Sequence, residues 1–331
     1  MGSKSDFENS LHTLFTRVFG ENCNLESFRR LSGGASQETW ALSGDKHAAI
    51  LRRAPGGTSK ARSSAAIGLP AEAKLISAAN GTGVPVPDIL YVLGDEDGLG
   101  DGFVMSLVAG ETIARPILRN DEFALARKVL AGQCGSALAD IHTIPLDSAP
   151  PELQTSDGLA QISQYEDIYR SFGSPRPVFE LALQWLKANA PAPTPSVLVH
   201  GDFRLGNLMI DESGLVAVLD WELAHIGDAR EDIAWLCVNS WRFGQTENRV
   251  GGFGQLEDLL EAYNTRAGTD ISPGDIDWWE MLGSLKWGVM CMIMYEAFRS
   301  GGDASVERAA IGRRVSETEI DLINLLEAAH A

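Results

Sequence analysis

Cysteine is scarce in this sequence, and its few residues lie far from one another. They are Cys23, Cys134, Cys237 and Cys291. No two of them form a C-x-x-C pair, and none has a histidine at zinc-ligand spacing. This spacing argues against a structural zinc site and against a disulfide framework. We therefore expect four reduced thiols in the core.

Basic side chains are also few: 27 Lys and Arg stand against 45 Asp and Glu, which gives a formal net charge of -18. Nucleic-acid phosphates and anionic lipids bind clusters of Lys and Arg, and this chain has no such clusters. We therefore expect no nucleic-acid partner and no membrane partner. Most of the excess acid follows residue 105, either as a solvated face or as a cleft that attracts a cationic substrate.

Several segments and motifs are missing altogether. No apolar run approaches membrane-spanning length, and the opening MGSKSD has no apolar core of a secretion signal. A cytoplasmic location is the resulting expectation. The chain also has no G-x-S-x-G, H-E-x-x-H or Walker-type G-x-x-x-x-G-K-[ST] motif, which disfavours the hydrolase classes that depend on them.

The pattern of apolar residues divides the 331-residue chain into two parts. An amphipathic helix at 7–19, strands at 28–31, 38–42, 48–52 and 102–108, and a helix beginning near Pro70 make up the first part. The second part is mainly helical, and beyond Asp232 we expect helix to the end of the chain. It also contains a β hairpin before residue 220. These patterns predict an α+β, bilobal protein: a β-rich lobe at 1–105, a mainly helical lobe at 106–331, and a hinge at about 105–110.

The most informative segment is HGDFRLGN at residues 200–207, followed by DWE at 220–222. Asp202 and Asn207 have the spacing of the base and the metal-holding Asn in the kinase loop H-R-D-x-x-x-x-N, and Asp220 follows where a second metal ligand is expected. Amide and carboxylate oxygens suit Mg²⁺. The sequence therefore predicts Asp202 as the catalytic base and Asn207 and Asp220 as metal ligands.

Five nearby residues are candidates for loop support or substrate contact. His200 is expected to orient the loop by hydrogen bonding, and Arg204 to contact a phosphate or to pair with an acidic neighbour. Asp232 is expected to bond to the loop backbone. Glu222 and Asp228 are better placed for substrate.

The first lobe contains the candidates for phosphate binding. Ser32, Gly33 and Gly34 lie between two strands, where backbone N–H groups can approach phosphates. Arg52 ends the third strand at the place of the phosphate-contacting Lys of a V-A-I-K strand, and Glu72 is its expected helix partner.

These motifs together resemble the aminoglycoside phosphotransferase family, in its broad phosphotransferase-enzyme branch, over nearly the whole chain. HGDFRLGN, DWE and GDAREDIAWL carry the resemblance in the second lobe, and LSGGASQETW, AAILRRAP and FVMSLVAGE carry it in the first. It implies a protein-kinase-like fold. It also implies that the Ser106 C=O and the Val108 N–H bond the nucleotide base, with Met105 behind the base and Met209 and Leu219 beneath it.

Three positions depart from the kinase pattern: Arg52 replaces the usual Lys, and Trp221 and Glu222 replace the Phe and Gly of D-F-G. The expected function is Mg²⁺-dependent transfer of the γ-phosphate of ATP or GTP to a hydroxyl of a small molecule. The alternative, motivated by Arg52 and Trp221, is a kinase-like module that binds a nucleotide or metabolite without transfer. The acceptor is an aminoglycoside or another hydroxylated metabolite, such as a hydroxyacyl thioester. The Met-rich segment at 290–294 favours a less polar acceptor.

Overall fold

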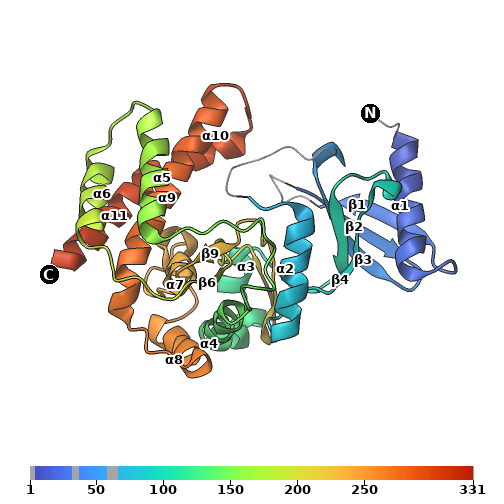
Figure 1. Ribbon diagram of the computed structural model, residues 1–331, viewed down its shortest axis with the longest axis horizontal. Helices are drawn as coiled ribbons and strands as arrows, with labels where there is room; N and C mark the ends of the chain where they lie inside the picture. The colour runs from blue at the N-terminus through green and yellow to red at the C-terminus, as the bar shows by residue number, and fades with distance from the viewer. Residues whose placement is uncertain (1–3, 32–36, 58–65, 331) are drawn as a thin grey trace.

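The computed structural model describes residues 4–31, 37–57 and 66–330. Its first part is an antiparallel five-stranded sheet in the order β1-β2-β3-β5-β4. The strands are β1 (Leu25–Arg30), β2 (Glu38–Gly44), β3 (Ala48–Arg53), β4 (Ile89–Val92) and β5 (Gly102–Ser106). Helix α1 (Lys4–Phe19) packs on the outer side of this sheet, and α2 (Leu69–Thr82) lies on the side facing the rest of the chain (Figure 1).

The second part is mainly helical, as the sequence predicts. Its helices are α3 (Ala114–Arg119), α4 (Ala124–His142), α5 (Gly158–Ser171), α6 (Pro177–Ala188), α7 (Ala229–Cys237), α8 (Leu256–Ala267), α9 (Pro273–Arg299), α10 (Val306–Gly312) and α11 (Val315–His330). Single 3-10 turns are η1 (Pro55–Gly57), η2 (Asp95–Asp97), η3 (Asp121–Phe123) and η4 (Asn239–Trp241). No helix among the residues just defined is both long and apolar enough to span a membrane.

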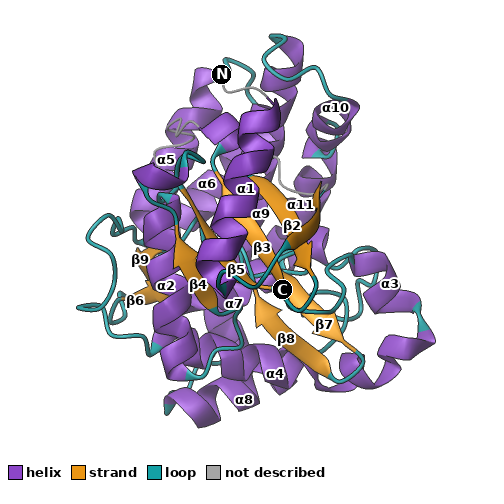
Figure 2. Ribbon diagram, turned by 90° about the vertical axis from the view of Figure 1, so that its right-hand side faces the viewer, coloured by secondary structure: helices purple, strands orange, loops and turns teal. Residues whose placement is uncertain are grey.

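Two short antiparallel ladders interrupt the helices. β6 (Val197–Val199) pairs with β9 (His225–Gly227), and β7 (Leu208–Asp211) pairs with β8 (Gly214–Val218). Figure 2 shows the β7–β8 hairpin below the five-stranded sheet. The Val218 N–H donates to the Pro85 C=O at 2.7 Å, which ties the hairpin to the segment that follows α2.

Helix α2 forms where the sequence predicts it because its ends are well specified. Pro70 occupies the first turn, where a missing N–H costs nothing, and Gly83 ends the helix in the left-handed region with φ 91°. Its buried side chains, including Leu75 and Ile76, join the core of the helical part. Helix α2 thus precedes residue 105 in sequence and yet packs with the core of the helical part. The lobe boundary at residue 105 stays a prediction.

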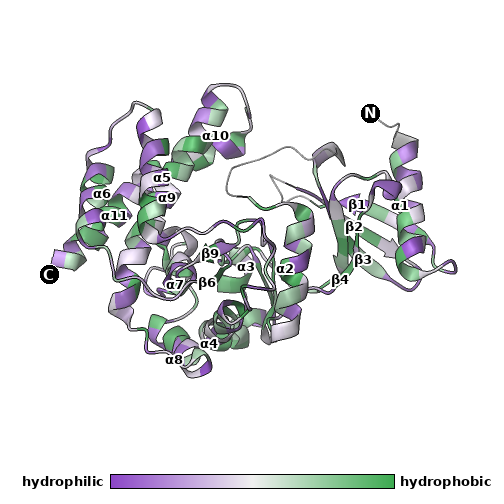
Figure 3. Ribbon diagram, viewed as in Figure 1, coloured by the Kyte–Doolittle hydropathy of each residue, from purple (hydrophilic) through white to green (hydrophobic). Residues whose placement is uncertain are grey.

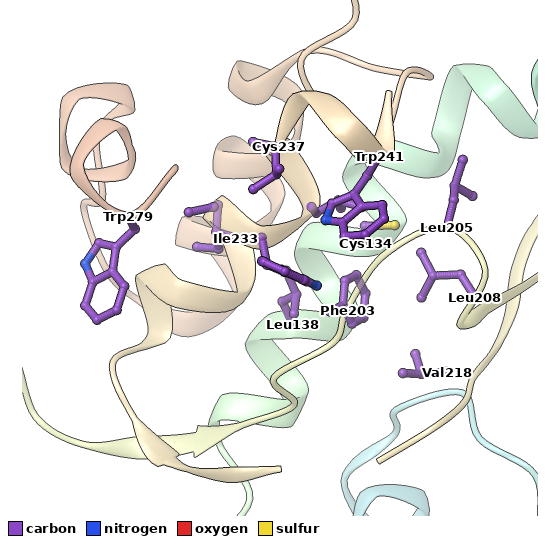
Figure 4. Close-up of a cluster of buried hydrophobic side chains, with 14 of the residues drawn as sticks. Cys134, Leu138, Phe203, Leu205, Leu208, Val218, Ile233, Cys237, Trp241 and Trp279 are labelled. Carbon is purple, nitrogen blue, oxygen red and sulfur yellow. The ribbon is translucent and has the colours of Figure 1, made fainter. Parts of the chain in front are cut away.

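The apolar side chains form two cores. The smaller one lies between α1 and the sheet, where the predicted helical face of Leu11, Leu14 and Phe15 is fully buried. The larger core surrounds α4, which Figure 3 shows largely in green. Figure 4 shows Phe203 of the HGDFRLGN loop beside Leu138 of α4, so the loop is anchored in this core.

The expectation that the chain is helical from Asp232 to its end is wrong in the segments between the helices, and the longest of these lies between α7 and α8. After α7 and the η4 turn, no helix forms between residue 242 and the start of α8. Gly244, Gly251 and Gly252 have φ values of 85°, 54° and 77° there, which is left-handed backbone that an α-helix cannot contain.

The four cysteines are all buried and unbridged, as expected.

Candidate active site

The HGDFRLGN loop follows β6 and turns sharply at its second residue. Gly201 has φ 82°, and a Cβ at this position would collide with the backbone carbonyl oxygen of Leu223. Only glycine can adopt this left-handed backbone and also leave room for the Leu223 carbonyl oxygen. His200 is fully buried before the turn. Its Nδ1 accepts the Asp202 N–H at 3.2 Å, so its Nε2 carries the proton and donates to the Leu219 C=O at 3.1 Å.

Asp232, in the first turn of α7, holds the loop backbone. Its two carboxylate oxygens accept the N–H groups of His200 and Gly201 at 2.7 and 2.9 Å. His142 of α4 contacts the same carboxylate at 3.2 Å. Although burial opposes ionisation, these partners lower the pKa of Asp232, and burial lowers the pKa of His200. The geometry agrees with the supporting roles expected of both residues.

Asp202 is oriented by three donors. Its Oδ1 accepts the Trp235 indole N–H at 2.8 Å and the Arg204 Nε–H at 2.9 Å. Its Oδ2 accepts the Asn207 amide at 2.6 Å. The same Asn207 nitrogen donates to the Asp202 backbone C=O at 2.9 Å, so the amide oxygen of Asn207 is directed away from Asp202. Arg204 thus pairs with an acidic neighbour, one of the two roles expected of it.

The hairpin brings Asp220 next to Asn207, as its pairing predicts. The Leu219 N–H donates to the Asn207 C=O at 2.8 Å. Asp220 itself has φ 66°, a left-handed conformation that costs a non-glycine residue on the order of 1 kcal/mol or more. Trp221 is fully buried behind it and packs on the His200 ring with centroids 4.8 Å apart. The strained turn therefore presents the Asp220 carboxylate while its neighbour anchors the backbone.

Arg52 reaches the second lobe from the end of β3. Its Nη2 donates to the Asp220 carboxylate, its Nε lies 3.3 Å from Glu72 Oε1, and Glu222 lies 3.9 Å away. Three carboxylates surrounding one guanidinium raise its pKa against the opposing effect of burial. Burial, together with the nearby charges of Asp220 and Glu222, raises the pKa of Glu72 to about 7 despite Arg52.

An inter-lobe cleft of about 230 Å³ opens beside these groups. Its lining combines polar residues at one end with an apolar floor and roof; the residues are Leu31, Thr39, Arg52, Glu72, Ile76, Pro87, Phe103, Met105, Thr112, Gly206, Asn207, Met209, Val218, Leu219 and Asp220. Met105, Met209 and Leu219 are thus brought together, as predicted. Ser32, Gly33 and Gly34 lie outside the described residues.

The segment after β5 crosses from the sheet to the hairpin at the edge of this cleft. Glu111 and Ile210 exchange backbone hydrogen bonds of 2.8 and 2.9 Å. Gly110 lies so close to Met209 that a Cβ would come within 2.8 Å of its side chain. The Val108 N–H donates to no acceptor within the part of the chain that the structure describes. Met105 lines the cleft, and the predicted contacts of Ser106 and Val108 with a nucleotide base stay a prediction.

The polar end of the cleft fits a divalent cation bound together with phosphates. Among the described residues, buried Glu72 Oε1, Glu72 Oε2 and Arg52 Nε have no hydrogen-bond partner with suitable geometry, although Arg52 Nε and Glu72 Oε1 form an ion pair. Across residues 4–31, 37–57 and 66–330, no group of three or more His, Cys, Asp or Glu side chains could hold a metal. Asn207 and Asp220 supply two hard oxygens, and Mg²⁺ commonly completes such a set with phosphate oxygens and water.

A second hollow, here called the loop pocket, lies on the other side of the Asp202 loop. It has a volume of about 290 Å³ and is lined by Ala66, Ile67, Glu152, Gln154, Thr155, Ser156, Ala160, Gln161, Gln164, Tyr165, Gly201, Leu223, Ala224, His225, Glu231, Trp235, Lys286 and Met290. Asp202 separates it from the inter-lobe cleft, since both Gly201 and Trp235 border the pocket and adjoin Asp202.

Not every predicted residue joins this group. Asp228 caps α7 by accepting the Arg230 N–H at 2.9 Å, and its carboxylate pairs with the Arg230 side chain at 2.6 Å. It borders a separate hollow beside Trp278 and Trp279. Conversely, sequence reasoning missed Trp235. The available signal was its position three residues after Asp232, which places both side chains on the face of α7 that meets the loop.

A five-stranded sheet, a helical lobe, Asn207 and Asp220 at the cleft between them, and Asp202 hydrogen-bonded to Asn207 define a protein-kinase-like fold of the phosphotransferase class. The model of the phosphotransferase enzyme family, APH, matches residues 27–269, and the chain belongs to this family.

Solved structures share this fold, and a curated protein is similar in sequence. A Ralstonia eutropha protein classed as an aminoglycoside phosphotransferase superposes with a TM-score of 0.76 and 21% identity, covering 97% of this chain and 98% of its own. The GDP complex of aminoglycoside 2'-phosphotransferase-IIIa gives a TM-score of 0.68 at 15% identity, covering 97% and 99%. Mouse acyl-CoA dehydrogenase family member 10 is 30% identical over 212 residues, 62% of this chain. The match covers only 20% of that relative's length.

Proposed function

We propose that this chain transfers the γ-phosphate of ATP or GTP to a hydroxyl of a small molecule in a Mg²⁺-dependent reaction, with Asp202 as the base. The observation that carries the proposal is a chain of contacts: Asp202 is bonded to the Asn207 amide, and Asn207 and Asp220 line the same cleft as Arg52. Their spacing in sequence and their contacts in space agree with a single phosphoryl-transfer centre.

The nucleotide is proposed to occupy the inter-lobe cleft. Met105, Met209 and Leu219 provide apolar surfaces for the base, and the Val108 N–H and Ser106 C=O provide its hydrogen-bonding edge. In this proposal, residues 105–110 form the hinge between the lobe at 1–105 and the lobe at 106–331. The GDP complex of the 2'-phosphotransferase relative supports a purine nucleotide as the donor.

In the proposed reaction, Asp202 accepts the proton of the acceptor hydroxyl as its oxygen bonds to the γ-phosphorus. The bond from that phosphorus to the β–γ bridging oxygen breaks, and the nucleoside diphosphate leaves. Asn207 and Asp220 would hold Mg²⁺, which would supply neutralisation of the phosphate charge. Arg52 contributes a cation from the other lobe, and neutral His200 keeps the loop in register.

Substitution of Asp202 by Asn tests the base directly, because the amide preserves shape and removes basicity. We expect turnover to fall by about 10³-fold or more with nucleotide affinity within about twofold of wild type. Turnover is measured as Mg²⁺-dependent nucleoside diphosphate release and affinity by calorimetry. Undiminished turnover in the variant would remove Asp202 from this role.

A kinase-like module that binds nucleotide without transfer is the second candidate. The observation that favours it is the direct bond between Arg52 and Asp220, which occupies a metal ligand. The two candidates differ in a simple measurement: a binding module shows nucleotide affinity with no diphosphate release above background in the presence of Mg²⁺ and a broad panel of hydroxylated acceptors.

A further inference from the structure

The loop pocket is lined by a network of four side chains from α5, β9, α7 and α9, of which Gln161, Glu231 and Lys286 are buried and His225 is partly buried; we call this network the pocket floor. Glu231 Oε1 accepts the Lys286 ammonium at 2.8 Å. Glu231 Oε2 accepts the Gln161 amide at 2.6 Å and His225 Nε2 at 3.1 Å. The Gln161 oxygen accepts a second N–H of Lys286 at 2.8 Å. Both oxygens of Glu231 therefore accept hydrogen bonds within the protein.

His225 carries a positive charge in this arrangement. Its Nε2 faces the Glu231 carboxylate, and its Nδ1 faces the Leu223 C=O at 3.0 Å. Both partners are acceptors only, so both ring nitrogens must donate, and a doubly protonated imidazole is a cation. Burial opposes this charge, but Glu231 raises the pKa of His225 above its ordinary value.

The pocket floor thus holds one carboxylate and two cations. Lys286 has three N–H donors, and two of them are bonded to Gln161 and Glu231. The ammonium is flanked by the rings of Tyr165 and Trp235, with centroids 5.6 and 5.5 Å away, and a ring face is a weaker partner than an oxygen. Among the residues that the structure describes, the third donor has no oxygen partner, so it is left for a ligand oxygen. The other carboxylate lining the pocket, Glu152, is exposed to solvent.

We propose that the loop pocket binds an acceptor that carries a carboxylate beside the reacting hydroxyl, so that the substrate class is a hydroxy acid and not a polycation. The inference rests on the proposed function, since the pocket adjoins Asp202 through Gly201 and Trp235. A floor with a net positive charge and one unused N–H of Lys286 favours an anionic oxygen and repels an ammonium group.

The first test compares matched acceptors on the wild-type chain. The anionic probes are 3-hydroxybutyrate and 4-hydroxybutyrate, the neutral probe is 1,3-butanediol, and the cationic probes are ethanolamine and kanamycin. Binding is measured by calorimetry, and transfer by Mg²⁺-dependent diphosphate release. We expect at least tenfold preference for the anionic probes. Preference for the amines, or binding of no probe by a chain that still binds nucleotide, overturns the proposal.

The second test changes charge at the pocket rim without touching the buried network. Gln164 lines the pocket and is exposed, so Gln164→Glu and Gln164→Lys form a matched pair. We expect hydroxy-acid affinity to fall about threefold with Glu and to rise about threefold with Lys, while 1,3-butanediol binding stays unchanged. Equal effects of the two variants contradict an anionic acceptor.

Lys286→Met supplies the direct test of the floor. It should lower hydroxy-acid affinity about tenfold or more and leave nucleotide affinity unchanged. If the variant does not fold, the Gln164 pair decides the matter. If the wild-type chain shows neither Mg²⁺-dependent nucleotide binding nor diphosphate release, the proposed function is refuted. Hydroxy-acid binding to the loop pocket is measured separately by calorimetry, so the two failures can be told apart.

Discussion

The guanidinium of Arg52 bonds directly to the carboxylate of Asp220, across the inter-lobe cleft and between residues 168 positions apart. The pair joins the end of β3 to the turn after β8. It also links the proposed phosphate-binding cation to a proposed metal ligand. In the proposed function, this bond has to break so that Arg52 can bind phosphate and Asp220 can bind the metal. The binding of nucleotide and the binding of metal are then coupled.

Substitution of Arg52 by Gln tests this coupling. We expect the KM for nucleotide to rise by about tenfold or more, because a buried cation facing the phosphates is lost. Arg53→Gln is the matched control on the same strand. Arg53 pairs with Glu38 at 2.8 Å and stacks on Phe7, away from the cleft. If both variants change the KM equally, Arg52 has no special place at the phosphates.

Glu72 should make the stability of the nucleotide-free chain depend on pH. Its pKa rises from 4.5 to about 7 on folding, mainly through burial, so the folded state binds the proton more tightly. Stability from this group is then present at low pH and is lost as pH rises from 4.5 to about 7. The difference is on the order of 3 kcal/mol. Unfolding by urea at pH 5 and pH 8 measures it, and Glu72→Gln should show a flatter dependence; parallel profiles would contradict the assignment.

Trp235 is expected to act on the reaction by positioning Asp202. Trp235→Phe removes the indole donor from Asp202 Oδ1, and we expect kcat to fall about tenfold with the nucleotide KM unchanged. Trp241→Phe is the control, since the rings lie 5.3 Å apart and the buried Trp241 N–H has no partner among the described residues. A similar loss of kcat in both variants would point to packing.

Asp232 should be required for loop stability. Asp232→Ala removes the acceptor of the His200 and Gly201 N–H groups and leaves both without a partner in the core, at a cost of about 3 kcal/mol in the free energy of unfolding. Asp228→Asn, at the cap of the same helix, should cost less than about 1 kcal/mol. Chemical denaturation compares the two variants. Equal costs would show that Asp232 is only a helix-terminal charge.

The sequence carries the local chemistry of the site. The spacing of Asp202, Asn207 and Asp220 follows from motif and hairpin pairing, both of which act over about 20 residues or fewer. Strand alternation and helix-end signals likewise predict the meander and α2, because these features depend on near neighbours. The segment between α7 and α8 shows the limit, since its glycines adopt left-handed backbone that helical periodicity does not reveal.

Only the tertiary structure joins Arg52 to Asp220, places the Trp235 indole on Asp202, and gathers Gln161, His225, Glu231 and Lys286 beneath the loop pocket. Each of these contacts depends on how elements distant in sequence pack, and no local pattern encodes that packing. The sequence by itself determined the spacing of Asp202, Asn207 and Asp220, from which their roles as base and metal ligands are predicted. The fold decided what surrounds them, because charge, burial and hydrogen-bond direction are set by neighbours in space.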